Sequence, residues 1–118
     1  MFENLLKKLN WSSGRRDGGY KIKRLFQSQK LKMDCYLLYY TTGDTITPHT
    51  DPVKEGKHYR LNVELIKAKE GGKFQLEGKP RFKLLRAVCF SPSDQEHSVT
   101  KIEKGYRLVL SIGWIKNK

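Results

Sequence analysis

The sequence has few cysteines, few acidic residues and no long hydrophobic run, and each shortage excludes a class of protein. The two cysteines, Cys35 and Cys89, are too few for a disulfide framework. Both lie in apolar runs that favour buried thiols, although a single bridge between them is left open. No stretch approaches the roughly 20 apolar residues of a membrane span, and the first eight residues lack the apolar core of a secretion signal. We therefore expect one cytoplasmic domain over residues 1–118 with no membrane association.

Basic residues outnumber acidic ones by two to one. The chain has 24 Lys and Arg against 12 Asp and Glu, a formal net charge of +12, and nine of the basic residues precede residue 34. A field of this sign attracts polyanions, so nucleic acid, an acidic protein or an anionic surface would all be drawn to it. No zinc-finger spacing, helix-turn-helix pattern or ribonucleoprotein signature accompanies the charge. We expect an acidic or polyanionic macromolecular partner, and the sequence does not indicate an oligomeric state.

The hydrophobic pattern predicts one short helix followed by strands. Apolar residues fall at helical spacing within residues 1–10, and serine and glycine then break the chain. The predicted strands cover or begin at residues 20–26, 31–41, 45–47, 59–66, 73–76, 84–90, 97–99 and 106–115. About eight short strands separated by turn signals indicate an all-β barrel or sandwich, of which the jelly roll is the eight-stranded form. We expect a helix and loop over residues 1–19 and the β core over residues 20–118.

Three side chains could hold a metal ion. His49 and Asp51 are two residues apart, so at a strand end both point the same way. His97 follows Asp51 by 46 residues, near the start of another predicted strand. Two histidines and one carboxylate on one face form the facial triad of non-haem Fe(II) oxygenases, which leaves coordination positions open for substrates. A His-X-Asp triplet alone is weak evidence, and the three residues together carry the prediction.

Arg107 adds a fourth element to this pattern. It lies ten residues after His97, in a predicted strand whose alternation puts Arg107, Val109 and Ser111 on one face. A guanidinium can bind a carboxylate through two parallel hydrogen bonds, and a nearby hydroxyl can add a third. Alone, Arg107 would be an ordinary surface charge. Beside a three-ligand metal site, we favour an anchor for an anionic cosubstrate.

Several short motifs resemble those of the 2-oxoglutarate- and Fe(II)-dependent dioxygenases, with the prolyl-hydroxylase-like branch as the nearest. They are His49-Thr50-Asp51, Gly71-Gly72, Phe90-Ser91-Pro92 ahead of His97-Ser98-Val99, and Gly105-Tyr106-Arg107 before a strand that ends in Gly113-Trp114. The resemblance covers roughly residues 34–116 in order and approximate spacing. It implies a double-stranded β-helix, a jelly roll, which agrees with the strand count.

The resemblance also implies roles for individual residues. His49, Asp51 and His97 would bind Fe(II), and Arg107 would bind the distal carboxylate of 2-oxoglutarate. Tyr40 would assist Arg107, with Tyr39 as the alternative because strand parity is uncertain by one residue, and Ser111 is a weaker candidate. Such enzymes use O2, with ascorbate as an accessory reductant, to hydroxylate a C–H bond and release succinate and CO2. His58 has no role in this pattern, and we expect it at the surface.

The substrate is the open part of the prediction. The nearest resemblance favours hydroxylation of a peptide or protein side chain such as proline, whereas the positive charge would equally suit hydroxylation or demethylation of a nucleic-acid base. A second class is a non-enzymatic basic β-barrel that binds nucleic acid. A third is a cupin-type metal enzyme that does not use 2-oxoglutarate, which Arg107 makes less favourable. The short connections of the chain indicate a minimal core with either a shallow pocket or one completed by a partner.

Overall fold

The protein is described here by a computed structural model that covers residues 2–13, 18–53 and 56–116. One helix, α1 (Phe2–Lys7), precedes the strands. The strands are β1 (Ser12–Ser13), β2 (Lys21–Ser28), β3 (Met33–Tyr40), β4 (Ile46–His49), β5 (Lys57–Ile66), β6 (Glu70–Gly71), β7 (Phe74–Leu76), β8 (Phe82–Leu84), β9 (Ala87–Phe90), β10 (His97–Val99), β11 (Ile102–Lys104) and β12 (Arg107–Lys116).

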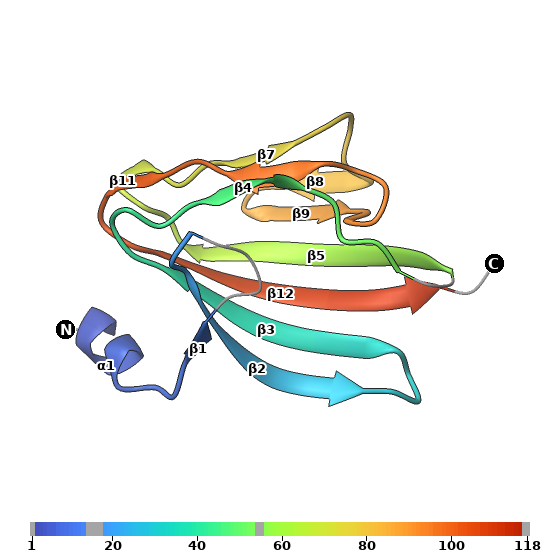
Figure 1. Cartoon of the computed structure of the whole chain (residues 1–118), viewed down its shortest axis with the longest axis horizontal. Helices are drawn as coiled ribbons and strands as arrows, with labels where there is room; N and C mark the ends of the chain where they lie inside the picture. Colours follow the sequence, from blue (N-terminus) through green and yellow to red (C-terminus); the bar gives the residue numbers. More distant parts are fainter. Residues whose placement is uncertain (1, 14–17, 54–55, 117–118) are drawn as a thin grey trace.

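The strands form two facing layers (Figure 1). The larger sheet has the order β1-β2-β3-β12-β5-β9-β8, the smaller sheet the order β4-β10-β7, and β11 pairs with β6 in a separate ribbon. All the pairings within the described residues are antiparallel. Strands distant in sequence thus alternate between the layers, and the fold is the predicted double-stranded β-helix with one short helix.

The inner face of the larger sheet is a ladder of side chains from β3, β12 and β5. Because successive strand residues point to opposite faces, every second residue of each strand shares this face. Across the ladder, Arg107 lies opposite Tyr40, Ser111 lies between Tyr36 and Asn62, and Gly113 lies between Asp34 and Arg60. This face is therefore unusually rich in charged and polar groups for the interior of a barrel.

Apolar groups are divided between the two faces of the larger sheet. Inside the barrel, a cluster of buried residues closes one end of the interior: Tyr20, Tyr40, Ile46, Ala68, Val99, Ile102 and Val109. On the outer face, Leu6 of α1 packs with Tyr39 and Leu108, and Trp11 packs against this group. The helix thus covers one end of the outer face and takes no part in lining the interior.

The predicted strand over residues 84–90 is wrong in one respect. Leu85 has φ of +52° and Leu84 pairs with Ala87, so the chain turns there and forms the hairpin of β8 and β9. A turn made of Leu85 and Arg86 carries no glycine, asparagine or proline to mark it in the sequence. The short strands β1, β6 and β11 were not predicted either, and their two or three residues are too few for a periodic pattern.

Both cysteines are free thiols, as the apolar runs around them favoured. Cys89 is buried and Cys35 is half-buried. Burial raises the pKa of each thiol, and the Asp34 charge acts in the same direction on Cys35. Among the described residues, no helix is both long and apolar enough to cross a membrane.

Replacement of Ile102 by alanine tests the interior cluster. Ile102 is fully buried, so Ile102→Ala should lower the free energy of unfolding by about 2–5 kcal/mol, measured by urea denaturation. Leu85→Ala is the matched control, because Leu85 is 90% exposed and its loss should change the free energy by less than about 0.5 kcal/mol. Equal effects of the two substitutions would contradict this description of the core.

Candidate metal centre

His49 and His97 are cross-strand neighbours in the smaller sheet. His49 ends β4, His97 begins β10, and the register of this antiparallel pair sets the two residues directly opposite each other. Their imidazole centroids are 4.3 Å apart with the rings inclined at 54°. Residues separated by 48 positions are thus brought together by one strand pairing, with both side chains on the same face.

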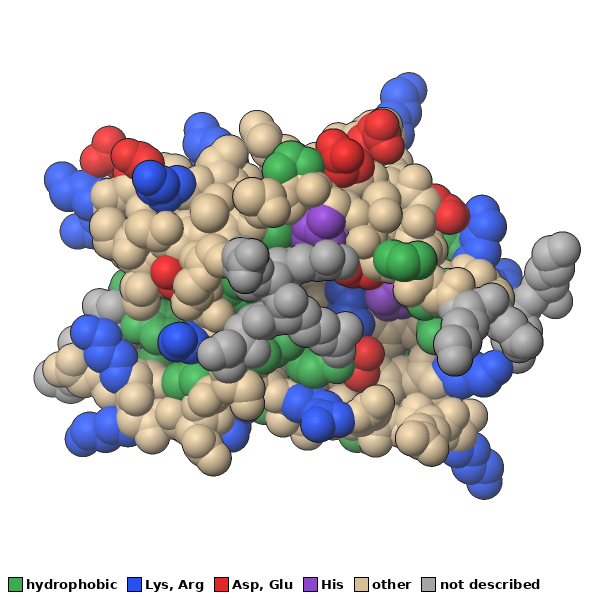
Figure 2. Space-filling model, in the orientation of Figure 1, with side chains coloured by type: hydrophobic (Ala, Val, Ile, Leu, Met, Phe, Trp, Pro, Cys, Tyr) green, Lys and Arg blue, Asp and Glu red, His purple; other side chains and the backbone are tan. Residues whose placement is uncertain are grey.

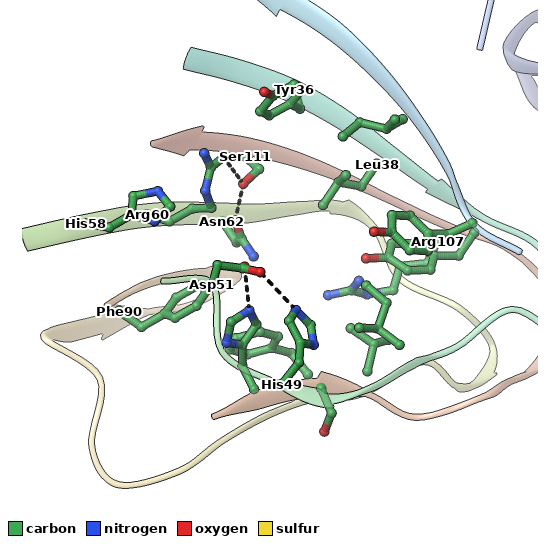
Figure 3. A pocket seen from close by; sticks show the side chains of 18 residues that line it. Tyr36, Leu38, His49, Asp51, His58, Arg60, Asn62, Phe90, Arg107 and Ser111 are labelled. Carbon is green, nitrogen blue, oxygen red and sulfur yellow. Dashed lines mark hydrogen bonds and ion pairs between the residues drawn. The ribbon is translucent and has the colours of Figure 1, made fainter. Parts of the chain in front are cut away.

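Asp51 completes the cluster from the loop after β4. Its backbone N–H donates to the carbonyl of Pro92 at 2.8 Å, which fixes the loop beside the start of β10. The carboxylate lies 3.6 Å from Nε2 of His49 and 3.3 Å from Nε2 of His97 (Figure 3). One donor atom from each of the three residues lies within 4.8 Å of the others, close enough to bind one ion.

The backbone orients both imidazoles. Nδ1 of His49 lies 2.8 Å from the carbonyl oxygen of Thr47, and Nδ1 of His97 lies 3.0 Å from that of Gln95. Since a carbonyl can only accept, each Nδ1 serves as the donor, and the other ring nitrogen, Nε2, is the one that faces Asp51. Metal-binding histidines characteristically use the second ring nitrogen in this way. Two imidazoles and one carboxylate are a donor set that fits Fe(II).

Arg107 lies in the same cavity as the cluster, on the first residue of β12. It is only 4% exposed, its Nε donates to Oε2 of Glu64 at 2.7 Å, and its guanidinium carbon lies 4.9 Å from the centre of the Tyr40 ring. A buried guanidinium is costly unless it is paired, and Glu64 supplies the opposite charge. In Figure 3 the Arg107 guanidinium points toward the two histidines.

Tyr40 is a neutral hydrogen-bonding group at this site. Complete burial raises the pKa of Tyr40 to about 12, although the Arg107 charge acts in the opposite direction. The phenol therefore keeps its proton throughout the neutral range and can donate a hydrogen bond to an anion bound at Arg107. Burial and charge together give the pair two kinds of donor for one carboxylate.

Tyr39 and Ser111 are not brought to Arg107. The ring of Tyr39 lies on the outer face of the sheet, 5.3 Å from Trp11 and 6.2 Å from Tyr106 between centroids. Ser111 is buried on the inner face but donates to Oδ1 of Asn62 at 2.5 Å and accepts from Arg60 at 2.8 Å. Ser111 thus bonds with residues of β5, and it lies four residues from Arg107 along β12.

The expected surface position of His58 is wrong, because His58 is half-buried and lines the cavity. The alternation of β5 puts His58 on the same face as Arg60, so this alternation could have predicted that His58 faces the cavity. Sequence reasoning also missed the partnership of Glu64 with Arg107. Alternation places Glu64 on the polar face of β5, but the strand register sets it opposite Val109, and only the side-chain contact shows that it meets Arg107.

The cavity between the layers has a volume of about 100 Å³ and is lined by the metal cluster, Arg107, Tyr40 and the polar ladder. Phe90 and Phe74 form its apolar wall, with ring centroids 5.0 Å and 6.2 Å from that of His97. Figure 2 shows histidine side chains within a central hollow, with Lys and Arg around the edge of this face. Apolar walls limit the access of water and strengthen the electrostatic interactions inside.

Comparisons with known proteins bear on the fold. No family model and no curated protein matches the sequence. A prolyl-4-hydroxylase from Pseudomonas putida is 14% identical, with a TM-score of 0.68 over 99% of this chain and 82% of its own. An oxidoreductase of the 2OG-Fe(II) oxygenase family from Burkholderia pseudomallei is 12% identical, with a TM-score of 0.68 over 97% of this chain and 76% of its own.

A cupin-like protein from Thermotoga maritima is 15% identical, with a TM-score of 0.59 over 94% of this chain and 89% of its own. At these identities the likenesses show the fold alone. The chain therefore has the double-stranded β-helix that 2OG-Fe(II) oxygenases share with cupins, and the side chains of its own cavity must carry any functional conclusion.

Metal titration tests the cluster directly. We expect one divalent ion, with Mn(II) as the probe, to bind per chain in isothermal titration calorimetry, and His49→Ala to weaken binding at least about 100-fold. His58→Ala is the matched control, because it removes an imidazole from the same cavity outside the cluster, and it should leave the affinity unchanged. Equal losses in the two variants would contradict the assignment.

Proposed function

We propose that this protein is an Fe(II)- and 2-oxoglutarate-dependent dioxygenase that hydroxylates a C–H bond of a peptide or protein side chain. The observation that carries the proposal is the convergence of His49, Asp51 and His97 in one cavity with a buried arginine. A metal cluster alone would suit many cupin-fold proteins. A guanidinium aimed into the same enclosed space adds a fixed site for the carboxylate of a cosubstrate.

Each residue has a distinct task in this proposal. His49, Asp51 and His97 hold Fe(II), and Arg107 with the neutral Tyr40 binds the distal carboxylate of 2-oxoglutarate. Iron and 2-oxoglutarate together supply the oxidation, in which O2 is consumed, the 2-oxo acid is decarboxylated to succinate and CO2, and one oxygen atom enters the substrate C–H bond. The aromatic wall of Phe74 and Phe90 keeps bulk water from the reacting atoms.

The positive charge of the chain supports a macromolecular substrate that is acidic. Lys and Arg lie around the edge of this face together with some Asp and Glu (Figure 2), and the net charge of +12 would attract an acidic peptide at long range. His58 also lines the cavity, but a C–H oxidation at iron needs no general base, so the proposal assigns it no catalytic role.

Turnover without a substrate tests the proposed chemistry. Purified protein with Fe(II), ascorbate, O2 and 2-oxoglutarate should form succinate slowly, and Asp51→Ala should abolish this formation because the carboxylate ligand is lost. Arg107→Gln should raise the KM for 2-oxoglutarate at least about 10-fold while Mn(II) affinity is retained, since Arg107 binds the cosubstrate and not the metal. Succinate formation that survives Asp51→Ala would contradict the proposal.

Glu64 should reduce the affinity for 2-oxoglutarate. Its carboxylate and the distal carboxylate of the cosubstrate would both bind the guanidinium of Arg107. Two negative charges on one guanidinium are close enough to repel each other. Glu64→Gln keeps an oxygen acceptor for Nε of Arg107 but removes the charge, so we expect the KM for 2-oxoglutarate to fall about 3- to 10-fold. If the KM rises instead, the role of Glu64 is only to hold Arg107 in place.

A further inference from the structure

A second arginine, Arg60, faces the metal cavity and has no role in the proposed chemistry. Both arginines line the cavity, both are paired with a carboxylate, and both lie over a tyrosine of β3. The guanidinium carbon of Arg60 lies 5.4 Å from the centre of the Tyr36 ring, much as Arg107 lies over Tyr40. In Figure 3 the Arg60 guanidinium lies beside Ser111, in another part of the cavity than Arg107.

The position of Arg60 depends on a row of three residues across the sheet. Arg60, Gly113 and Asp34 are directly opposite one another on β5, β12 and β3. The arginine side chain crosses over Gly113, and its Nη2 donates to Oδ1 of Asp34 at 2.5 Å. A Cβ built on Gly113 would lie 2.1 Å from Nη2 of Arg60, so only glycine at this position leaves room for the guanidinium.

Two N–H groups of the Arg60 guanidinium are hydrogen-bonded, and the others can bind a further acceptor. Nη1 donates to Oγ of Ser111 at 2.8 Å, and Ser111 in turn donates to Asn62. These two contacts use two of the five N–H groups of a guanidinium, and no other hydrogen-bond partner of Arg60 lies within the described part of the chain. A rigid, partly satisfied guanidinium that lines a cavity is prepared to bind a further acceptor.

A surface groove adjoins this end of the cavity. Its volume is about 570 Å³, and it is lined by both row partners of Arg60, Gly113 and Asp34, with Lys32, Met33 and Trp114 beside them. His58 lines both the groove and the cavity, so the two spaces meet next to Arg60. A peptide in the groove could therefore extend one side chain past Arg60 toward the metal cluster.

We propose that Arg60 binds a carboxylate of the primary substrate, so that the residue presented for oxidation is acidic or is flanked by an acid. This inference rests on the proposed function, because it assigns Arg107 to 2-oxoglutarate and leaves Arg60 for the substrate. The positive charge of the chain also favours an acidic substrate.

Paramagnetic NMR of the Mn(II)-loaded protein tests this site without turnover. The probes are the peptide acetyl-Gly-Asp-Gly-amide, its Asn counterpart and free N-acetylaspartate, each with 2-oxoglutarate present. The metal should enhance relaxation of the aspartyl protons, with the acidic peptide bound at least about 10-fold tighter than the Asn peptide. Preference for the peptide over N-acetylaspartate would assign a peptide substrate, and the reverse would assign a free acid.

Variants then assign the binding to Arg60. Arg60→Gln should weaken the acidic peptide about 10- to 100-fold and leave the affinity for 2-oxoglutarate within about 2-fold. Arg81→Gln is the matched control, because Arg81 also lies over a tyrosine, Tyr59, but lines neither space, and it should change neither affinity. Arg60→Gln combined with Asp34→Asn removes both charges, and Gly113→Ala displaces the guanidinium without removing it. Both should reproduce the loss.

The outcomes separate this inference from the proposed function. Equal binding of the Asp and Asn peptides, no metal-enhanced relaxation of any acidic probe, or Arg60-dependent binding of octathymidylate instead would overturn the assignment of Arg60 while the succinate assay still stood. A loss of 2-oxoglutarate binding in Arg60→Gln would also overturn it, since Arg60 would then serve the cosubstrate. Absence of succinate in the wild-type protein would count against the proposed function alone.

Discussion

The pairing of β4 with β10 is the constraint on which the site depends. It sets His49 and His97 opposite each other, and the loop after β4 then needs only two further residues to bring Asp51 between them. Backbone carbonyls hold both rings, and Phe74 and Phe90 pack against His97, so the donor atoms converge. A slip of one residue in this register would turn one imidazole out of the cavity, because successive side chains of a strand point to opposite faces.

The larger sheet supplies the charged side chains that line the cavity beside this cluster. Its inner ladder places two arginines in one enclosed space, an arrangement that would be unfavourable if each did not meet a carboxylate and the face of a tyrosine. Gly113 makes the second of these positions sterically accessible. Charge pairing and the absence of one side chain therefore allow the barrel wall to hold two buried arginines in the cavity of the candidate metal cluster.

Much of this arrangement could be predicted from single strands. Alternation over residues 106–115 correctly put Arg107, Val109 and Ser111 on one face, and alternation over residues 59–66 did the same for the polar residues of β5. The partners across strands could not be predicted, because β12 pairs with strands about 50 and 75 residues earlier and nothing local encodes that order. For this reason Glu64 was missed, the contacts of Ser111 with Asn62 and Arg60 were not foreseen, and Tyr39 and Tyr40 could not be distinguished. The turn at Leu85 was missed because its residues carry no turn chemistry.

A crystal structure of the protein grown with Mn(II) and 2-oxoglutarate in the absence of a substrate tests the central claim most directly. The account predicts one ion bound by Nε2 of His49, Nε2 of His97 and the carboxylate of Asp51, with the distal carboxylate of 2-oxoglutarate within hydrogen-bond distance of Arg107 and Tyr40. An ion bound elsewhere, or a 2-oxoglutarate molecule whose distal carboxylate lies against Arg60 instead of Arg107, would contradict it.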